Sequence, residues 1–251
     1  MEEHSFASTV AETLDSNPLL LRNWEAIEQL KEENKQIGMG WVVAATGLFG
    51  VMTAPLAPVY LLSASAAAFP VMQWTQWRAA KVFRLLQTGK LLLEKFEAQG
   101  VEIYFRIPVE EANPIDLFVR FPKKTHLFIA LRSKGNTKII YNEAIEEISV
   151  KKKKGRASRW EPNPLVELSD QERWLTKNRD LFGMTSREAS KTPTAKVLVV
   201  CSPTKIDEHR EELYSEVGTF KTLALRRKGT AFVIQEEELL DFVAAWLAKY
   251  E

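Results

Sequence analysis

The chain has 251 residues, and its 34 lysines and arginines nearly balance its 33 aspartates and glutamates, which leaves a formal net charge of +1. This balance excludes a strong overall field for nucleic acid, so anion binding must come from local patches of charge. The single cysteine, Cys201, excludes an internal disulfide and fits a reducing compartment. It lies in the apolar run Val197–Cys201, where a buried, inert thiol is expected.

Residues 1–36 are predicted to form a polar segment followed by an amphipathic helix. Asn17 and Pro18 give a typical helix start, because proline is favoured at the first helical position. Apolar residues then recur at helical spacing as far as about Gln36. We expect this helix either to lie on a membrane surface or to dock on the folded domain that follows.

The stretch from Gln36 to Trp77 contains no charged residue. It holds two apolar runs, Ile37–Met52 and Leu56–Met72, separated by a short turn. Each run approaches the length of about 20 residues that a helix needs to cross a hydrocarbon core. We therefore predict a transmembrane helical hairpin over residues 37–77, with the lipid bilayer as its partner. The alternative is a hairpin that is buried in a soluble protein, or one that dips into the bilayer without crossing it.

Basic residues flank this stretch on both sides. Lys31 and Lys35 precede it, while Arg78, Lys81 and Arg84 follow it, and the turn between the two runs carries no charge. The positive-inside rule then places both termini and the following domain on the cytoplasmic side. Small residues within both runs allow helices to pack closely in lipid. Another membrane protein or complex is therefore an expected partner.

Residues 78–251 are predicted to form one cytoplasmic α/β domain. A helix over Arg78–Gln99 ends at Gly100, a residue typical of helix ends. The pattern then changes to the alternation of a half-buried strand. Four strands are expected, at Val101–Ile107, Ile115–Phe121, His126–Arg132 and Thr137–Tyr141.

The second half of this domain continues with alternating helices and strands. Asn163 and Pro164 open a helix that reaches about Leu181. Further strands are expected at Lys196–Cys201, Phe220–Leu225 and Thr230–Ile234, a short helix at Glu208–Val217, and a last helix at Glu236–Tyr250. This order predicts a mixed sheet flanked by helices.

A basic run lies between the two halves of the domain. Its members are Lys151, Lys152, Lys153, Lys154, Arg156 and Arg159. They are candidates for binding nucleic acid phosphates or anionic lipid headgroups, and a solvated loop is the alternative. The three histidines are scattered without metal-ligand spacing, and no phosphate-binding glycine loop appears. We therefore expect no metal site and no small-molecule cofactor.

The domain resembles the nuclease-related domain family, which has a restriction-endonuclease-like fold. The resemblance covers about residues 86–245 and rests on three short segments. They are Pro114-Ile115-Asp116 on the second strand, Leu127–Arg132 on the third, and Asn163-Pro164 at the start of a helix that precedes the apolar strand Val197–Val200. The resemblance implies a mixed sheet with a metal site near the second and third strands.

Nucleases of this fold hold one or two Mg²⁺ ions with an aspartate and a glutamate, and a lysine two residues after that glutamate positions the attacking water. In the resemblance, Asp116 matches the aspartate, while Ala130 replaces the glutamate and Arg132 replaces the lysine. The family often has an acid after a helical glycine, where this chain has Lys90 after Gly89. The site has thus lost carboxylates and gained cations, and we expect no hydrolysis.

A relocated active site is the alternative to this loss. Glu94 or Glu102 would then supply the missing acid, and Lys134 would serve as the lysine, which gives a membrane-tethered nuclease that uses Mg²⁺. We favour a membrane-anchored, catalytically inactive nuclease-like domain that acts in binding, scaffolding or assembly. A third reading is a nucleic-acid-binding anchor that uses the basic run without cleaving its ligand.

Overall fold

The computed structural model describes residues 20–52, 57–110 and 112–250. Within them the chain forms two compact units. One is a helical unit, Asn23–Leu91, and the other is an α/β unit formed by the segments up to Arg22 and from Leu92 onward. The predicted helix start at Pro18 lies outside the described residues.

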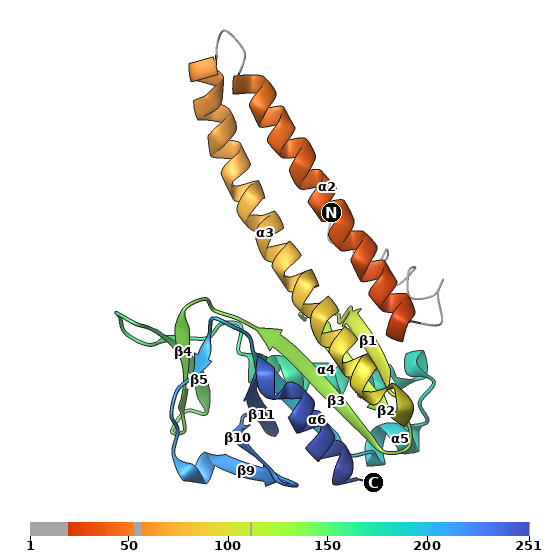
Figure 1. Cartoon of the computed structure of the whole chain (residues 1–251). Helices are drawn as coiled ribbons and strands as arrows, with labels where there is room; N and C mark the ends of the chain where they lie inside the picture. Colours follow the sequence, from red (N-terminus) through yellow and green to blue (C-terminus); the bar gives the residue numbers. More distant parts are fainter. Residues whose placement is uncertain (1–19, 53–56, 111, 251) are drawn as a thin grey trace, which may run out of the picture. The chain divides into compact units, whose positions relative to one another are not determined.

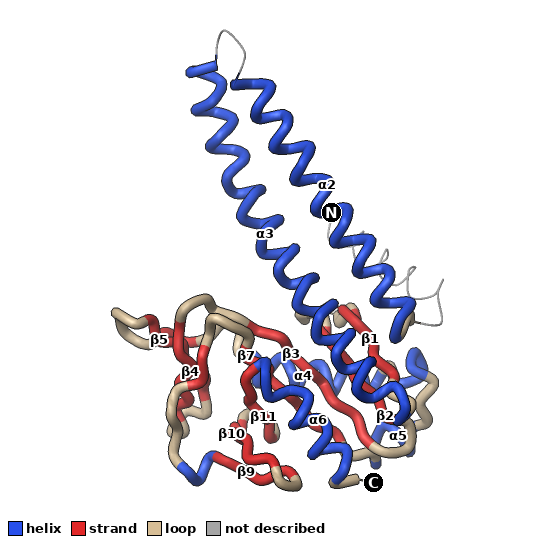
Figure 2. Tube along the Cα trace, in the orientation of Figure 1, coloured by secondary structure: helices blue, strands red, loops and turns tan. Residues whose placement is uncertain are grey.

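Two long helices make up the helical unit (Figures 1 and 2). α2 (Asn23–Met52) has 30 residues, and α3 (Ala57–Phe96) has 40 residues and continues into the α/β unit. An ion pair of 2.8 Å joins Arg78 of α3 to Glu33 of α2. The predicted helical hairpin is thus present, and each of its helices continues into sequence that we expected to form a separate helix.

The prediction that this hairpin crosses a membrane is not confirmed. Among the residues that the structure describes, no helix is long and apolar enough to cross a bilayer.

The α/β unit begins with an antiparallel meander. β1 (Glu102–Ile107) pairs with β2 (Ile115–Phe121), and β2 pairs with β3 (Thr125–Arg132). A 3-10 turn before β1 ends at Gly100, whose φ of +72° suits a residue without a side chain. The three predicted strands are confirmed to within a residue at either end.

The meander belongs to a seven-stranded mixed sheet in the order β1-β2-β3-β7-β11-β10-β9. β7 (Thr194–Val200) runs parallel to both β3 and β11 (Thr230–Gln235), while β10 (Phe220–Arg226) and β9 (Tyr214–Val217) pair in antiparallel fashion. β3 and β7 are buried along almost their whole length. This burial on both faces explains their nearly continuous apolar sequences.

A second sheet of four strands has the order β6-β5-β4-β8. Its strands are β4 (Thr137–Asn142), β5 (Glu147–Lys152), β6 (Ser158–Arg159) and β8 (Lys205–Ile206). The predicted strand at Thr137–Tyr141 is confirmed. The basic run thus begins within a strand and continues through the turn of the β5–β6 hairpin.

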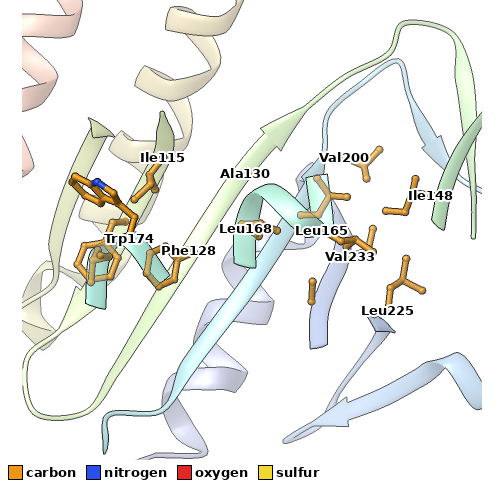
Figure 3. Close-up of a cluster of buried hydrophobic side chains, with 14 of the residues drawn as sticks. Ile115, Phe128, Ala130, Ile148, Leu165, Leu168, Trp174, Val200, Leu225 and Val233 are labelled. Carbon is orange, nitrogen blue, oxygen red and sulfur yellow. The ribbon is translucent and has the colours of Figure 1, made fainter. Parts of the chain in front are cut away.

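Helices cover both faces of the larger sheet. They are α4 (Pro164–Lys177), the short α5 (Ser186–Lys191) and α6 (Leu239–Ala248), with 3-10 turns at Arg179–Phe182, Glu211–Leu213 and Glu236–Glu238. Leu165 of α4 belongs to the core cluster that contains Phe128 and Val233 (Figure 3). Phe232 points to the opposite face, and its ring centroid lies 5.3 Å from that of Phe242 in α6. The predicted mixed sheet flanked by helices is therefore correct.

The predicted short helix at Glu208–Val217 is wrong. The segment forms a 3-10 turn followed by the edge strand β9, in which Val217 pairs with Phe220 of β10. Gly218 supplies the turn between these strands with a φ of +59°. Pairing along the sheet edge overrides the helix propensity of this glutamate-rich segment.

Candidate functional site

One face of the β2–β3 hairpin carries polar residues at both ends and an aromatic pair between them. Asp116, Phe118 and Arg120 share this face because side chains alternate along β2. Phe118 lies opposite Phe128 with ring centroids 5.2 Å apart, and Arg120 lies opposite His126. The aromatic pair separates a polar group around Asp116 from another around Arg120.

The first group, which we call the carboxylate cluster, consists of Asp116, Arg132 and Glu167. Asp116 Oδ2 accepts a hydrogen bond from the backbone N–H of Leu131 at 3.0 Å and another from Nη1 of Arg132. Nη2 of the same guanidinium donates to Glu167 Oε2 at 3.0 Å. One arginine therefore bridges two carboxylates from different elements.

All three side chains of the carboxylate cluster are withdrawn from solvent. The side chain of Asp116 is fully buried, while those of Glu167 and Arg132 are 9% and 16% exposed. Burial by itself would lower the pKa of Arg132, but the two carboxylates outweigh it, and the pKa is raised. Arg132 thus remains a cation between two acids.

The start of α4 positions Glu167. Asn163 caps the helix, because its side chain accepts a hydrogen bond from the backbone N–H of Leu165 at 3.0 Å. The side-chain amide of Asn113 donates to Glu167 Oε1, and Nε2 of Gln171 donates to the carbonyl of Asn113 at 3.1 Å. These bonds connect α4 to the segment just before β2, so Glu167 is held beside Asp116.

Of the other predicted site residues, Ala130 and Lys134 lie apart from this cluster. Ala130 is buried in the apolar core and offers no ligand atom. Nζ of Lys134 donates to the carbonyl of Glu161 at 3.3 Å and lies 5.6 Å from the ring centroid of Trp160. Lys90 is an exposed residue of the helical unit. Of the predicted site residues, the structure brings Asp116 and Arg132 into contact.

Of the acids proposed for a relocated site, Glu102 is placed elsewhere. Glu102 forms ion pairs with Arg22 and with Nη1 of Arg120, the latter at 2.8 Å. It pairs with Arg120 in the sheet, four residues along β2 from Asp116, which corresponds to about 13 Å of strand. Glu94 is an exposed residue near the end of α3. The position of Glu102 therefore gives no support to a site shared with Asp116.

A divalent cation at the carboxylate cluster would compete with Arg132. Mg²⁺ needs carboxylate oxygens, and both carboxylates already accept hydrogen bonds from this guanidinium. An arginine also stays protonated, so it cannot replace a lysine that activates water. In the described residues, no group of three or more histidine, cysteine, aspartate or glutamate side chains is arranged to hold a metal ion. The geometry is that of a closed ion-pair network.

The second polar group is centred on Arg120. Its Nε and Nη2 donate to Oε1 of Glu188 in α5, at 3.0 and 2.6 Å, while Nη1 donates to Glu102. His126 Nε2 lies 3.8 Å from the same oxygen of Glu188. Burial lowers the pKa of His126 to about 4, with Arg120 adding to this effect and Glu188 opposing it. The imidazole is therefore neutral at physiological pH.

The predicted anion-binding residues lie on the β5–β6 hairpin and are exposed. They are Lys151, Lys152, Lys153, Lys154, Arg156 and Arg159. Nε of Arg159 lies 2.9 Å from Oε2 of Glu147. For the other five cations, no carboxylate within the described ranges is close enough for an ion pair. This hairpin is thus a patch of positive charge open to solvent.

The sequence did not identify Glu167 as part of the site. It lies 35 positions from Arg132, and nothing in its local pattern distinguishes it from a solvated helix residue. One signal was available, because Asn163 and Pro164 fix the start of α4 and therefore the face on which Glu167 stands. No family model matches this chain, and no curated protein and no solved structure matches it either. The resemblance to the nuclease-related domain family stays a prediction.

Proposed function

We propose that this protein is a membrane-associated binding or scaffolding protein whose nuclease-like domain does not hydrolyse nucleic acid. The observation that carries the proposal is the bridge that Arg132 forms between Asp116 and Glu167. A metal-dependent nuclease needs these carboxylates for its cation. In this protein an arginine, which cannot be deprotonated at physiological pH, bridges them instead.

Attachment to a membrane is supported by the helical unit. Its sequence lacks charge from Gln36 to Trp77. Trp74 and Trp77, at the end of this stretch, have exposed fractions of 58% and 72%, and the guanidinium of Arg78 lies 5.4 Å from the ring centroid of Trp74. Tryptophans with adjacent cations are typical of the interface between lipid and water. We propose the cytoplasmic side for both termini and for the α/β unit, with another membrane protein or complex as the partner.

A cleavage assay on the full-length protein tests the loss of hydrolysis. Single- and double-stranded DNA and RNA are incubated with the protein and Mg²⁺ or Mn²⁺, and Asp116→Ala serves as the matched control. We expect both proteins to leave all four substrates intact. Cleavage by the parent that disappears in Asp116→Ala would establish a metal-dependent nuclease and overturn the proposal.

Membrane attachment is tested by flotation of the full-length protein with lipid vesicles. We expect the protein to float with the vesicles, and Trp74→Ala/Trp77→Ala to float less. The control Phe83→Ala/Leu91→Ala removes two exposed apolar side chains that lie about 9–21 Å further along α3 from Trp77. It should float like the parent. Protein that stays at the bottom of the gradient would contradict attachment.

A second candidate function is binding of nucleic acid without cleavage, and the open positive charge of the β5–β6 hairpin favours it. Phosphate contacts make binding strongly dependent on salt, and each contact adds to that dependence. Replacing Lys151, Lys152, Lys153 and Lys154 by glutamine should abolish salt-dependent DNA binding if this candidate is correct. Equal binding by the parent and the variant would exclude the hairpin as the nucleic-acid site.

A further inference from the structure

A hollow of about 370 Å³ lies between the β2–β3 turn and α5. We call it the basic hollow, because its lining contains four cations, Lys123, Lys124, Arg187 and Lys191, and one acid, Glu188. In Figure 1, α5 lies beside the ends of β2 and β3 where this turn is formed. The basic hollow is separate from the carboxylate cluster, which lies at the other end of the same hairpin.

Glu188, the one acid among the lining residues, is already paired with Arg120. Oε1 of Glu188 accepts hydrogen bonds from Nε and Nη2 of Arg120. For Lys123, Arg187 and Lys191, no carboxylate of the described chain lies within ion-pair distance. The lining therefore carries an excess of positive charge, which no carboxylate of the described residues offsets at these three side chains.

The two walls of the hollow are fixed to each other. The carbonyl of Pro193, in the segment after α5, accepts hydrogen bonds from Thr125 Oγ1 at 2.7 Å and from the backbone N–H of His126 at 2.9 Å. On the other wall, Arg120 holds α5 through Glu188. The turn is closed by a bond of 3.0 Å from the backbone N–H of Lys124 to the carbonyl of Phe121. The backbone of both walls is thus held in place before any ligand binds.

Lys123, Arg187 and Lys191, which have no carboxylate partner among the described residues, favour one kind of ligand. An anion of low charge would leave part of the positive field uncompensated, whereas phosphate groups offer several charged oxygens as hydrogen-bond acceptors. The volume falls within the usual range for small-molecule sites, about 300–1,000 Å³. Thr185, which also lines the hollow, adds a hydroxyl that can donate to a phosphate oxygen.

We propose that the basic hollow binds a compact anion that carries two or more phosphate charges. The phosphates can belong to a soluble molecule or to a lipid headgroup, since both present the same oxygens. This proposal does not depend on the loss of hydrolysis at the carboxylate cluster. It assigns a ligand class to a part of the α/β unit that the proposed function leaves unused.

The test uses the full-length protein and two double variants of equal charge change. Lys123→Glu/Lys191→Glu reverses two cations of the hollow, and Lys151→Glu/Lys153→Glu reverses two cations of the β5–β6 hairpin. Binding of inorganic pyrophosphate is measured by calorimetry, and binding to vesicles of phosphatidylglycerol in phosphatidylcholine is measured by flotation, with and without pyrophosphate as a competitor.

We expect the hollow variant to weaken pyrophosphate binding by about tenfold or more, which corresponds to about 1.4 kcal/mol per factor of ten, and the hairpin variant to bind like the parent. A smaller gain in vesicle binding on adding phosphatidylglycerol to phosphatidylcholine, in the hollow variant alone and with competition by pyrophosphate in the parent, would identify a lipid headgroup as the source. Equal loss in both variants would show a non-specific charge effect and overturn the proposal. A parent that does not bind pyrophosphate would overturn it as well.

Discussion

At each end of the β2–β3 hairpin, one guanidinium bridges two carboxylates. The two ends differ because further cations lie open to solvent at the Arg120 end. Around Asp116, one guanidinium bridges two carboxylates, and all three groups are withdrawn from solvent. Around Arg120, the inner charges are paired as well, but Lys123, Arg187 and Lys191 line a hollow without carboxylate partners in the described residues. The same pattern of strands thus produces one closed ion-pair network and one open cationic surface.

The two ends of the hairpin are expected to have different roles, stability around Asp116 and ligand binding at the basic hollow. Breaking a buried ion pair costs much unfolding free energy, because the remaining charge has neither its partner nor water around it. Replacing an exposed cation changes the unfolding free energy little, because water screens its charge. Mutations at the two ends of the hairpin should therefore affect different measurements, and four predictions sharpen this contrast.

The largest effect is expected from Arg132→Met, which breaks the carboxylate cluster. It leaves Asp116 and Glu167 buried without their cation, and breaking a buried pair typically costs about 3–5 kcal/mol of unfolding free energy. The control is Arg159→Met, which removes an arginine that is 65% exposed. That loss should cost at most about 1 kcal/mol. Urea unfolding measures both, and equal costs would contradict the closed network.

The next effect concerns acid stability near Arg120. Because the pKa of His126 is lowered to about 4 in the folded state and is about 6.5 in an unfolded chain, the unfolded state gains a proton first as the pH falls. The contribution of neutral His126 to the unfolding free energy is therefore fully present above about pH 6.5. It is lost as the pH falls towards 4, by up to about 3 kcal/mol.

His126→Phe tests this assignment. It retains a ring beside Phe118, which lies 5.6 Å away between centroids, and removes the titrating group. The slope of unfolding free energy against pH should fall between pH 6.5 and 4, as measured by urea unfolding at several pH values. An unchanged slope would assign the acid sensitivity to other groups.

Helix caps should have a smaller effect. Asn163 caps α4, which carries Glu167, and Thr185 caps α5, which carries Glu188. Asn163→Ala and Thr185→Ala should each lower the unfolding free energy by about 1 kcal/mol, because each leaves helical N–H groups without an acceptor. The double variant should show the sum, since the two caps share no partner. A clearly non-additive result would mean that the two polar groups are coupled.

The smallest change in stability is expected from Lys123→Glu/Lys191→Glu in the basic hollow. Both side chains are exposed, and such surface substitutions usually shift the unfolding free energy by about 0.5 kcal/mol or less. Thermal unfolding without ligand measures this shift. A strongly destabilised variant would show that the cations have a structural role.

Much of the α/β unit follows from local pattern. The alternation in Ile115–Phe121 and the apolar run in Thr194–Val200 each specify a strand, because a buried sheet imposes its own periodicity. Glu208–Val217 could not be assigned this way, since its residues favour a helix and only the pairing with β10 makes its end a strand. Local sequence contains no information about that partner.

The candidate site was predictable only in part, for a similar reason. Asp116 and Arg132 stand on adjacent strands, and their contact follows from the meander. Glu167 reaches them from a helix, and the basic hollow joins a turn to a helix more than 60 positions away. Both depend on how helices pack on the sheet, which strand and helix periodicity does not determine.

In the proposed function, Arg132 stands between Asp116 and Glu167, where a nuclease would hold its metal ion. Calorimetric titration of the full-length protein with Mn²⁺, in parallel with Asp116→Ala, tests it most directly. The account predicts the same absence of tight Mn²⁺ binding in both proteins. Tight binding by the parent that is lost in Asp116→Ala would show that the cluster opens to a cation, and it would contradict the account.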